Sequence, residues 1–249
     1  MLKRSLLTLS AGILALSLSL TGCVQISIET ELKKDGSGKT DMEFVLLPST
    51  SEILAELAAI GDVPDVDIAR LASLDGQELQ ARVESHGVKV KKFKSRLKDD
   101  MRTISFRLEY KDLEGHAFAL DQISGEPGAG HLGVFAADEG NLVLKNTTYE
   151  FPEEVEEEDM AAVEPEEVSQ EVMVKQGELF GQLMRSGKDL TLFRSITVPG
   201  DMVGSNGMEI DGRTSTWWMD ESNRSEVKGN FDPNIVFSGK GLKIEPMVE

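Results

Sequence analysis

Apolar and polar residues alternate along several stretches of the chain, and this pattern predicts β-hairpins. Val24, Ile26 and Ile28 alternate with polar residues, as expected for a strand with one buried face. An Asp-Gly-Ser-Gly turn at residues 35 to 38 follows, and the alternation resumes over residues 42 to 46. The same pattern predicts two further hairpins, over residues 88 to 110 and 132 to 144.

Helical spacing of apolar residues predicts helices between these hairpins. The sequence favours helices over residues 52 to 60 with Ser51 as N-cap, about 65 to 73, and 75 to 86 ending at Gly87. A further helix is expected from near Pro165 to Met184. The predicted fold class is therefore α+β, an antiparallel β-sheet built from hairpins with helices packed on one face.

The first residues have the pattern of a secretory signal. A short basic opening precedes an uncharged apolar run over residues 5 to 20, which is too short for a settled membrane span. Its last four residues, Leu20-Thr21-Gly22-Cys23, resemble the lipobox of bacterial lipoproteins, and Cys23 is the one cysteine of the chain. The alternative is a free thiol behind an uncleaved helix.

The lipobox resemblance implies a lipid anchor. The signal peptide, residues 1 to 22, would be cleaved, and Cys23 would carry a diacylglycerol with acyl chains such as palmitate. Two or more acyl chains give stable membrane attachment. The expected location is the exported side of the cell envelope, in the outer membrane of a Gram-negative host because Val24 rather than Asp follows the cysteine.

Charge narrows the choice of partners. The formal net charge is −18 at pH 7, which disfavours nucleic acid. Seven cations nevertheless lie close together in the second predicted hairpin: Lys89, Lys91, Lys92, Lys94, Arg96, Lys98 and Arg102. They are either a contact for anionic lipid headgroups or solvated residues that prevent edge-to-edge strand pairing.

Other polar groups give weaker signals. Asp62, Asp65 and Asp67 fit helix caps better than a calcium loop, and the three histidines lack zinc-site spacing. The acidic stretch from residue 153 to 159 is expected to be a solvated linker, part of an insertion at about 153 to 185. No cofactor or metal is expected, and no catalytic motif occurs.

The C-terminal part predicts further strands and carries a family resemblance. Residues 190 to 198 alternate, and adjacent strand residues face opposite ways, so one of Trp217 and Trp218 is expected in the core and the other outside. The chain resembles the LppM-type bacterial lipoproteins in its lipobox, in its first strand and turn, and in the motifs at residues 196 to 200, 206 to 207, 211 to 212 and 216 to 217. The resemblance implies an α+β domain in the cell envelope without established enzyme activity, with Trp217 as the core residue and Trp218 as the candidate exposed contact.

These observations favour a lipid-anchored, non-enzymatic envelope lipoprotein. Its domain, residues 23 to 220, is expected to bind a lipid, a glycolipid or a protein partner at the membrane surface, and residues 221 to 249 are expected to form a partly ordered tail. A purely structural envelope component and an enzyme with an unrecognised carboxylate site are the alternatives.

Overall fold

The computed structural model describes residues 24–59, 74–125, 127–128, 130–151, 174–179, 181–182, 190–224 and 231–248. These residues form eleven strands in two mostly antiparallel sheets, together with helices, so the predicted α+β class is confirmed. The helical elements are α1 (Pro48–Ala59), α3 (Gly76–Val83), η2 (Glu84–His86), α4 (Leu113–Ser124) and η3 (Asp138–Gly140). None of the described helices is long and apolar enough to cross a membrane.

The larger sheet has seven strands in the order β3-β4-β2-β1-β7-β10-β9. Its strands are β1 (Val24–Leu32), β2 (Gly38–Leu46), β3 (Val88–Lys98), β4 (Met101–Tyr110), β7 (Leu190–Thr197), β9 (Glu209–Asp211) and β10 (Thr214–Met219). β1 and β7 run parallel, and every other pair in this sheet is antiparallel.

The smaller sheet has four strands in the order β5-β6-β11-β8. Its strands are β5 (Leu132–Ala136), β6 (Asn141–Asn146), β8 (Met202–Ser205) and β11 (Asn234–Ser238). The predicted hairpins therefore form β1 with β2, β3 with β4, and β5 with β6. Two of them join the larger sheet and the third joins the smaller one.

The first hairpin forms as predicted, and its turn chemistry and its packing agree on one register. β1 pairs with β2 from Val24 opposite Leu46 to Leu32 opposite Gly38. Gly36 adopts a φ of +84°, a conformation that glycine tolerates best. A Cβ at Gly38 would collide with the Tyr110 hydroxyl, so this position also needs a residue without a side chain.

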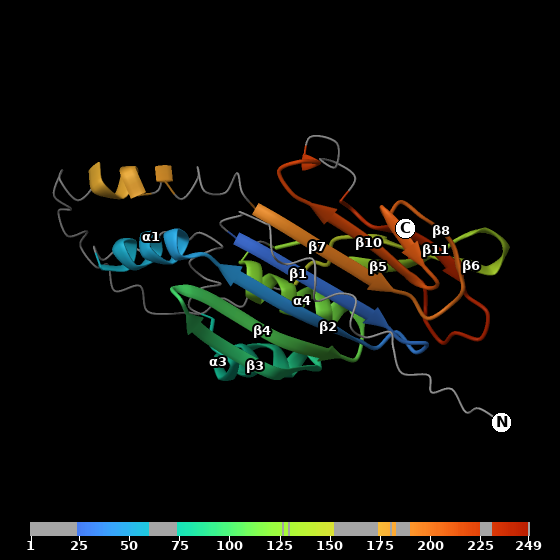
Figure 1. The fold of residues 1–249 in the computed structure, drawn as a ribbon. Helices are drawn as coiled ribbons and strands as arrows, with labels where there is room; N and C mark the ends of the chain where they lie inside the picture. The colour runs from blue at the N-terminus through green and yellow to red at the C-terminus, as the bar shows by residue number, and fades with distance from the viewer. Residues whose placement is uncertain are drawn as a thin grey trace, which may run out of the picture.

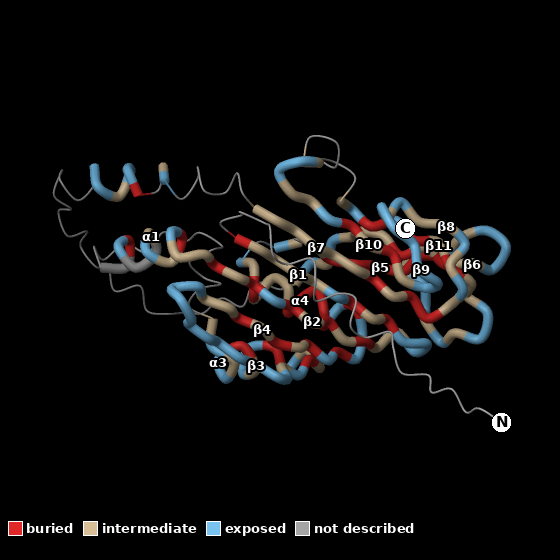
Figure 2. Tube along the Cα trace, in the orientation of Figure 1, coloured by how far each residue is buried: buried red, intermediate tan, exposed pale blue. Residues whose placement is uncertain are grey.

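One face of the larger sheet is covered and the other faces solvent. α3 and α4 pack on the β3 and β4 side, and the smaller sheet lies on the same side of the larger sheet (Figure 1). Buried residues of both sheets and of these helices form one continuous core (Figure 2). We call the face that contacts this core the inner face, and the opposite face the outer face.

Helix caps explain where the helices begin. Asp75 caps α3 by accepting hydrogen bonds from the backbone N–H groups of Gln77, at 2.8 Å, and Glu78, at 3.0 Å, so this predicted start is confirmed. Asp112 caps α4 in the same way through the N–H of Gly115 at 2.8 Å. α1 begins at Pro48 rather than after Ser51, because proline suits the first turn of a helix.

Several predicted segments fall outside the described residues. The expected helix over residues 65 to 73, the aspartates within residues 62 to 67 and the acidic stretch 153 to 159 belong to this group. Of the helix predicted from near residue 165 to 184, residues 174–179 are helical in the structure. Within them the Leu179 side chain is buried.

The expectation of a partly ordered tail after residue 220 needs correction for residues 231–248. β11 lies between β6 and β8, and its Ile235 and Phe237 side chains are fully buried. Met247 continues the contact by donating its backbone N–H to Val134 at 2.8 Å. The C-terminal segment is therefore part of the core, and the short apolar alternation within residues 235 to 237 was its sequence signal.

The burial of β11 predicts a large cost for truncating its central side chain. Phe237→Ala should lower the free energy of unfolding by about 3 to 5 kcal/mol, because a fully buried ring leaves a cavity. Val248→Ala is the control, since Val248 is 94% exposed, and it should change stability little. Urea denaturation of the chain from Val24 to Glu249 measures both; equal midpoints for the two variants would contradict the assignment of β11 to the core.

Candidate functional site

The basic hairpin occupies an edge of the larger sheet. β3 is the edge strand, and Lys89, Lys91, Lys94 and Arg96 lie opposite β4 residues that share the outer face. Arg102 differs, because it pairs with the buried Leu46 and so belongs to the inner face of the sheet. The predicted cations therefore follow the whole length of β3 on one face, with Arg102 on the other.

A β-bulge explains how consecutive lysines share this face. The register between β3 and β4 shifts between Lys91 and Lys94, and Lys92 has a φ of +55°. The bulge turns Phe93 inward, where its ring stacks on Phe106 with centroids 5.9 Å apart. A Cβ at Gly76 would clash with the Phe93 ring, so the glycine at the start of α3 makes room for this packing.

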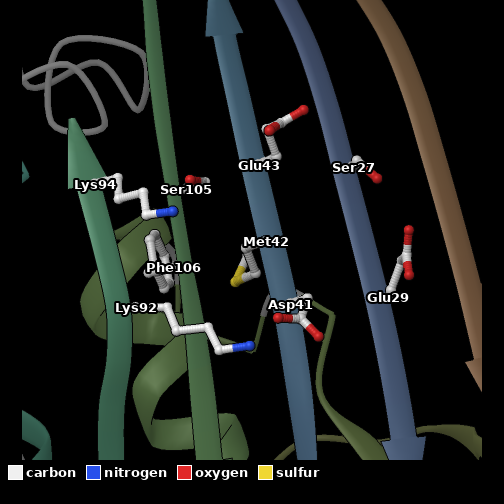
Figure 3. A pocket seen from close by; sticks show the side chains of 9 residues that line it. All are labelled: Ser27, Glu29, Asp41, Met42, Glu43, Lys92, Lys94, Ser105 and Phe106. Atoms are coloured by element: carbon white, nitrogen blue, oxygen red, sulfur yellow. The ribbon is translucent and has the colours of Figure 1, made fainter. Parts of the chain in front are cut away.

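Next to the bulge the outer face holds a depression of about 290 Å³ (Figure 3). Lysines from β3 and carboxylates from β1 and β2 line it, with a Met and a Phe at its floor. The lining residues are Ser27, Glu29, Asp41, Met42, Glu43, Lys92, Lys94, Ser105 and Phe106. Lys92 reaches from the edge strand toward Asp41 in Figure 3, so cations and carboxylates face one another across the depression.

One carboxylate of the depression is already engaged. Arg107 donates from Nε and from one terminal nitrogen to the two oxygens of Asp41, each at 2.8 Å. This bidentate pair raises the pKa of Arg107 above its ordinary value, chiefly through the hydrogen bond to Asp41. Among the described residues no cluster of three or more His, Cys, Asp or Glu could hold a metal ion. The site is suited to binding a polar, charged group on an open surface.

The start of the domain and the tip of the basic hairpin lie at the same end of the larger sheet. Val24 pairs with Leu46, Leu46 with Arg102, and Arg102 with Leu97. Three interstrand spacings of about 4.8 Å separate Val24 from Leu97, which is roughly 14 Å. Arg96 and Lys98 therefore lie at the end where the chain enters the domain, whereas Lys89 lies toward the other end.

The remaining predicted site residues have clear positions. Cys23 lies outside the described residues, immediately before Val24. Trp217 is buried, with 1% of its surface exposed, and Trp218 is 38% exposed on the outer face opposite Phe193, as the alternation of strand side chains required. Trp218 stays a predicted contact, since its position alone assigns no partner.

Beneath the sheet lies a polar cluster that the sequence did not predict. The hydroxyls of Thr30 and Thr40 are 3.2 Å apart, and the Thr40 hydroxyl is 2.9 Å from Nε2 of His116 on α4. Burial, with smaller contributions from the charges of Arg194 and His131, lowers the pKa of His116 to about 3. His116 is therefore neutral at pH 7. Its Nδ1 atom is buried without a hydrogen-bond partner.

Arg194 is a second polar group on the inner face. It lies on β7 between Ile28 of β1 and Trp217 of β10, in a strand whose other inward residues include Leu192 and Ile196. The period-two alternation of residues 190, 192 and 196 was the signal that position 194 faces inward. Burial lowers the pKa of Arg194 to about 10, so the guanidinium is still charged at neutral pH.

Comparison with known proteins gives a distant structural likeness. No family model matches the chain, and no curated protein matches it. The NMR structure of the folded domain of the Mycobacterium tuberculosis LppM protein is similar, with a TM-score of 0.41 and 11% sequence identity over 87% of this chain and 88% of that chain. A likeness at this level carries no inference about the chemistry of this protein.

The buried histidine predicts a loss of stability in acid. An unfolded His titrates near pH 6.5, whereas folded His116 binds a proton only near pH 3. Between these values the unfolded chain holds more protons, so the free energy of unfolding decreases as the pH falls. His116→Gln, whose amide can still bond Thr40, should weaken this pH dependence in urea denaturation between pH 7 and pH 4.

His86→Gln is the matched control, because His86 is only half-buried. It should retain the pH dependence of the parent chain. If the parent chain and His116→Gln lose stability equally over this pH range, carboxylates and not His116 would account for the acid sensitivity.

Proposed function

We propose that the protein is a lipid-anchored lipoprotein of the bacterial envelope that acts without catalysis, by binding anionic lipid headgroups through the cations of β3. The observation that supports the proposal is the position of β1. This strand begins at Val24, one residue after the proposed acylation site, and it is an interior strand of the seven-stranded sheet. The location proposed is the exported side of the membrane.

Because β1 begins directly after Cys23, the attachment point would determine which part of the domain faces the bilayer. Consecutive Cα atoms are about 3.8 Å apart, so an acyl-bearing Cys23 would hold Val24 at the level of the headgroups. Because β1 pairs on both sides, the sheet cannot turn independently of that point. The end of the sheet that contains Val24 and Leu46 would then lie next to the membrane.

Cations are present at that end of the sheet. Lys94, Arg96 and Lys98 follow one another on the exposed edge strand, and each cation near an anionic surface favours binding. Asp99 and Asp100 form the turn beside them, and Asp99 lies 3.9 Å from Lys98, so part of the positive charge is balanced within the hairpin. The remaining attraction should be weak and sensitive to salt.

The depression supports a binding role better than a hydrolytic one. A glycosidase-type mechanism uses two carboxyl groups that flank the scissile bond. Here Asp41 is already bound by Arg107, and the other two lining carboxylates, Glu29 and Glu43, stand on the open, solvent-facing side of a sheet. This arrangement favours binding over the enzymatic alternative.

Anchoring through Cys23 predicts the behaviour of a Cys23→Ser variant. Serine cannot form the thioether to diacylglycerol, so the variant should accumulate as an unprocessed precursor without fatty acid. Metabolic labelling with radioactive palmitate, followed by mass spectrometry of the N-terminus, measures both features. Normal labelling of Cys23→Ser would show that the anchor is elsewhere.

Headgroup binding through β3 predicts a charge-dependent affinity for vesicles. In the unacylated chain from Val24 to Glu249, replacing Lys94, Arg96 and Lys98 together by Gln should weaken binding to phosphatidylglycerol vesicles by roughly fivefold for each lost cation. Vesicle sedimentation at several salt concentrations measures this, and the salt dependence should become shallower in the variant.

The control removes the same charge from the other end of the sheet. Lys33 and Lys34 lie in the turn that joins β1 to β2, and Lys243 donates its backbone N–H to the Lys34 carbonyl at 2.7 Å. Their joint replacement by Gln should leave vesicle binding nearly unchanged. Equal losses in the two triple variants would mean that net charge alone, and not the β3 surface, governs binding.

A further inference from the structure

Among the described residues, two neighbouring buried N–H groups beneath the larger sheet have no acceptor: Nε of Arg194 and Nε1 of Trp217. Arg194 and Trp217 are direct partners across β7 and β10. Leaving a buried donor unpaired is costly, so two adjacent unpaired donors indicate a missing acceptor.

The cation in this region has no ion-pair partner among the described residues. Asp232 is the carboxylate whose charge acts on Arg194, but Asp232 accepts a hydrogen bond from Asn146 at 2.6 Å and forms no salt bridge with the arginine. The Arg194 side chain as a whole is half-buried, although its Nε is fully buried. Solvent therefore reaches part of the guanidinium.

Half-buried apolar residues surround Arg194 on the inner face. Leu190 and Leu192 of β7 and Met219 of β10 share the face of Arg194 and are only half-buried, as is Ile26 of β1. Farther along β7 the same face is fully buried at Ile196. A charged group thus stands at the border between the closed core and a partly exposed apolar surface.

We propose that Arg194 binds the anionic group, a carboxylate or a phosphate, of an amphiphile whose hydrocarbon part lies on Leu190, Leu192 and Met219. The guanidinium supplies charged donors that match such oxygens in geometry. The half-buried apolar side chains supply a surface from which an alkyl chain would displace water. This site is on the inner face, so it is separate from the headgroup contact on β3 and does not depend on lipid anchoring.

Titration with short amphiphiles tests the site and separates its two parts. The full chain in an uncharged maltoside detergent is titrated with octyl phosphate, octanoate, inorganic phosphate and octanol. Trp218→Phe serves as the background, because it leaves Trp217 as the single fluorescent tryptophan beside Arg194. Octyl phosphate or octanoate should change the Trp217 emission with saturation, and should bind at least about tenfold more tightly than octanol.

Replacing the arginine provides the decisive comparison. Arg194→Met should keep the fold, since an apolar side chain suits a buried position, and should reduce the affinity for octyl phosphate by about tenfold or more. Arg213→Met removes an exposed arginine that donates to the Pro199 carbonyl, and it should bind like the parent. Circular dichroism checks folding of each variant.

Each outcome decides for or against the site. Tight binding of the amphiphilic anions with loss in Arg194→Met supports the proposal, and weaker binding of inorganic phosphate supports the role of the apolar surface. If inorganic phosphate binds as tightly as octyl phosphate, the site takes a free anion and the amphiphile proposal is wrong. Unchanged binding in Arg194→Met, or no binding of any anion, would assign the unpaired nitrogens to water and overturn the proposal.

Discussion

Hydrogen-bond ladders on both edges of β1 connect the N-terminal hairpins to the C-terminal strands. On one edge β1 pairs antiparallel with β2 over nine residues, from Val24 to Leu32, and on the other it pairs parallel with β7. A parallel pair needs a long connection, and here β2, the hairpins of β3 with β4 and of β5 with β6, and helices α1, α3 and α4 lie between the two strands. The position of β1 in the middle of the sheet therefore determines which side chains face the core, which face solvent, and where the chain enters the domain.

The central strand also divides the chemistry of the molecule between two faces. Alternate residues of β1 point to opposite sides, so Ile26, Ile28 and Thr30 face the core while Ser27 and Glu29 face solvent. The outer face combines lysines and carboxylates on an open surface, where interactions are weak and screened. The inner face holds few polar groups in surroundings of low polarity, where each of them has a larger energetic effect.

Sequence periodicity predicted the hairpins and the α+β class because those features depend on local alternation and turn residues. It could not predict that β1 and β7 pair in parallel, since that contact joins residues more than 150 positions apart. In the candidate site, too, only the features that depend on local sequence could be predicted. The lysines of β3 were evident as a cluster, whereas the Asp41 to Arg107 pair and the polar group around His116 require the register of distant strands. The period-two alternation of β7 alone predicts that Arg194 faces the core, whereas the charge of an arginine favours a surface position.

That charge is the least expected feature of the core. A cation in apolar surroundings is costly unless a partner offsets its lost hydration, and a well-packed apolar residue often stabilises such a position. Leu190, Leu192 and Ile196 show that the inner face of β7 otherwise accepts aliphatic side chains. Folding alone therefore gives no reason for an arginine at residue 194. Together with the unpaired N–H of Trp217, this cost is best explained by an anionic partner that supplies the missing acceptor.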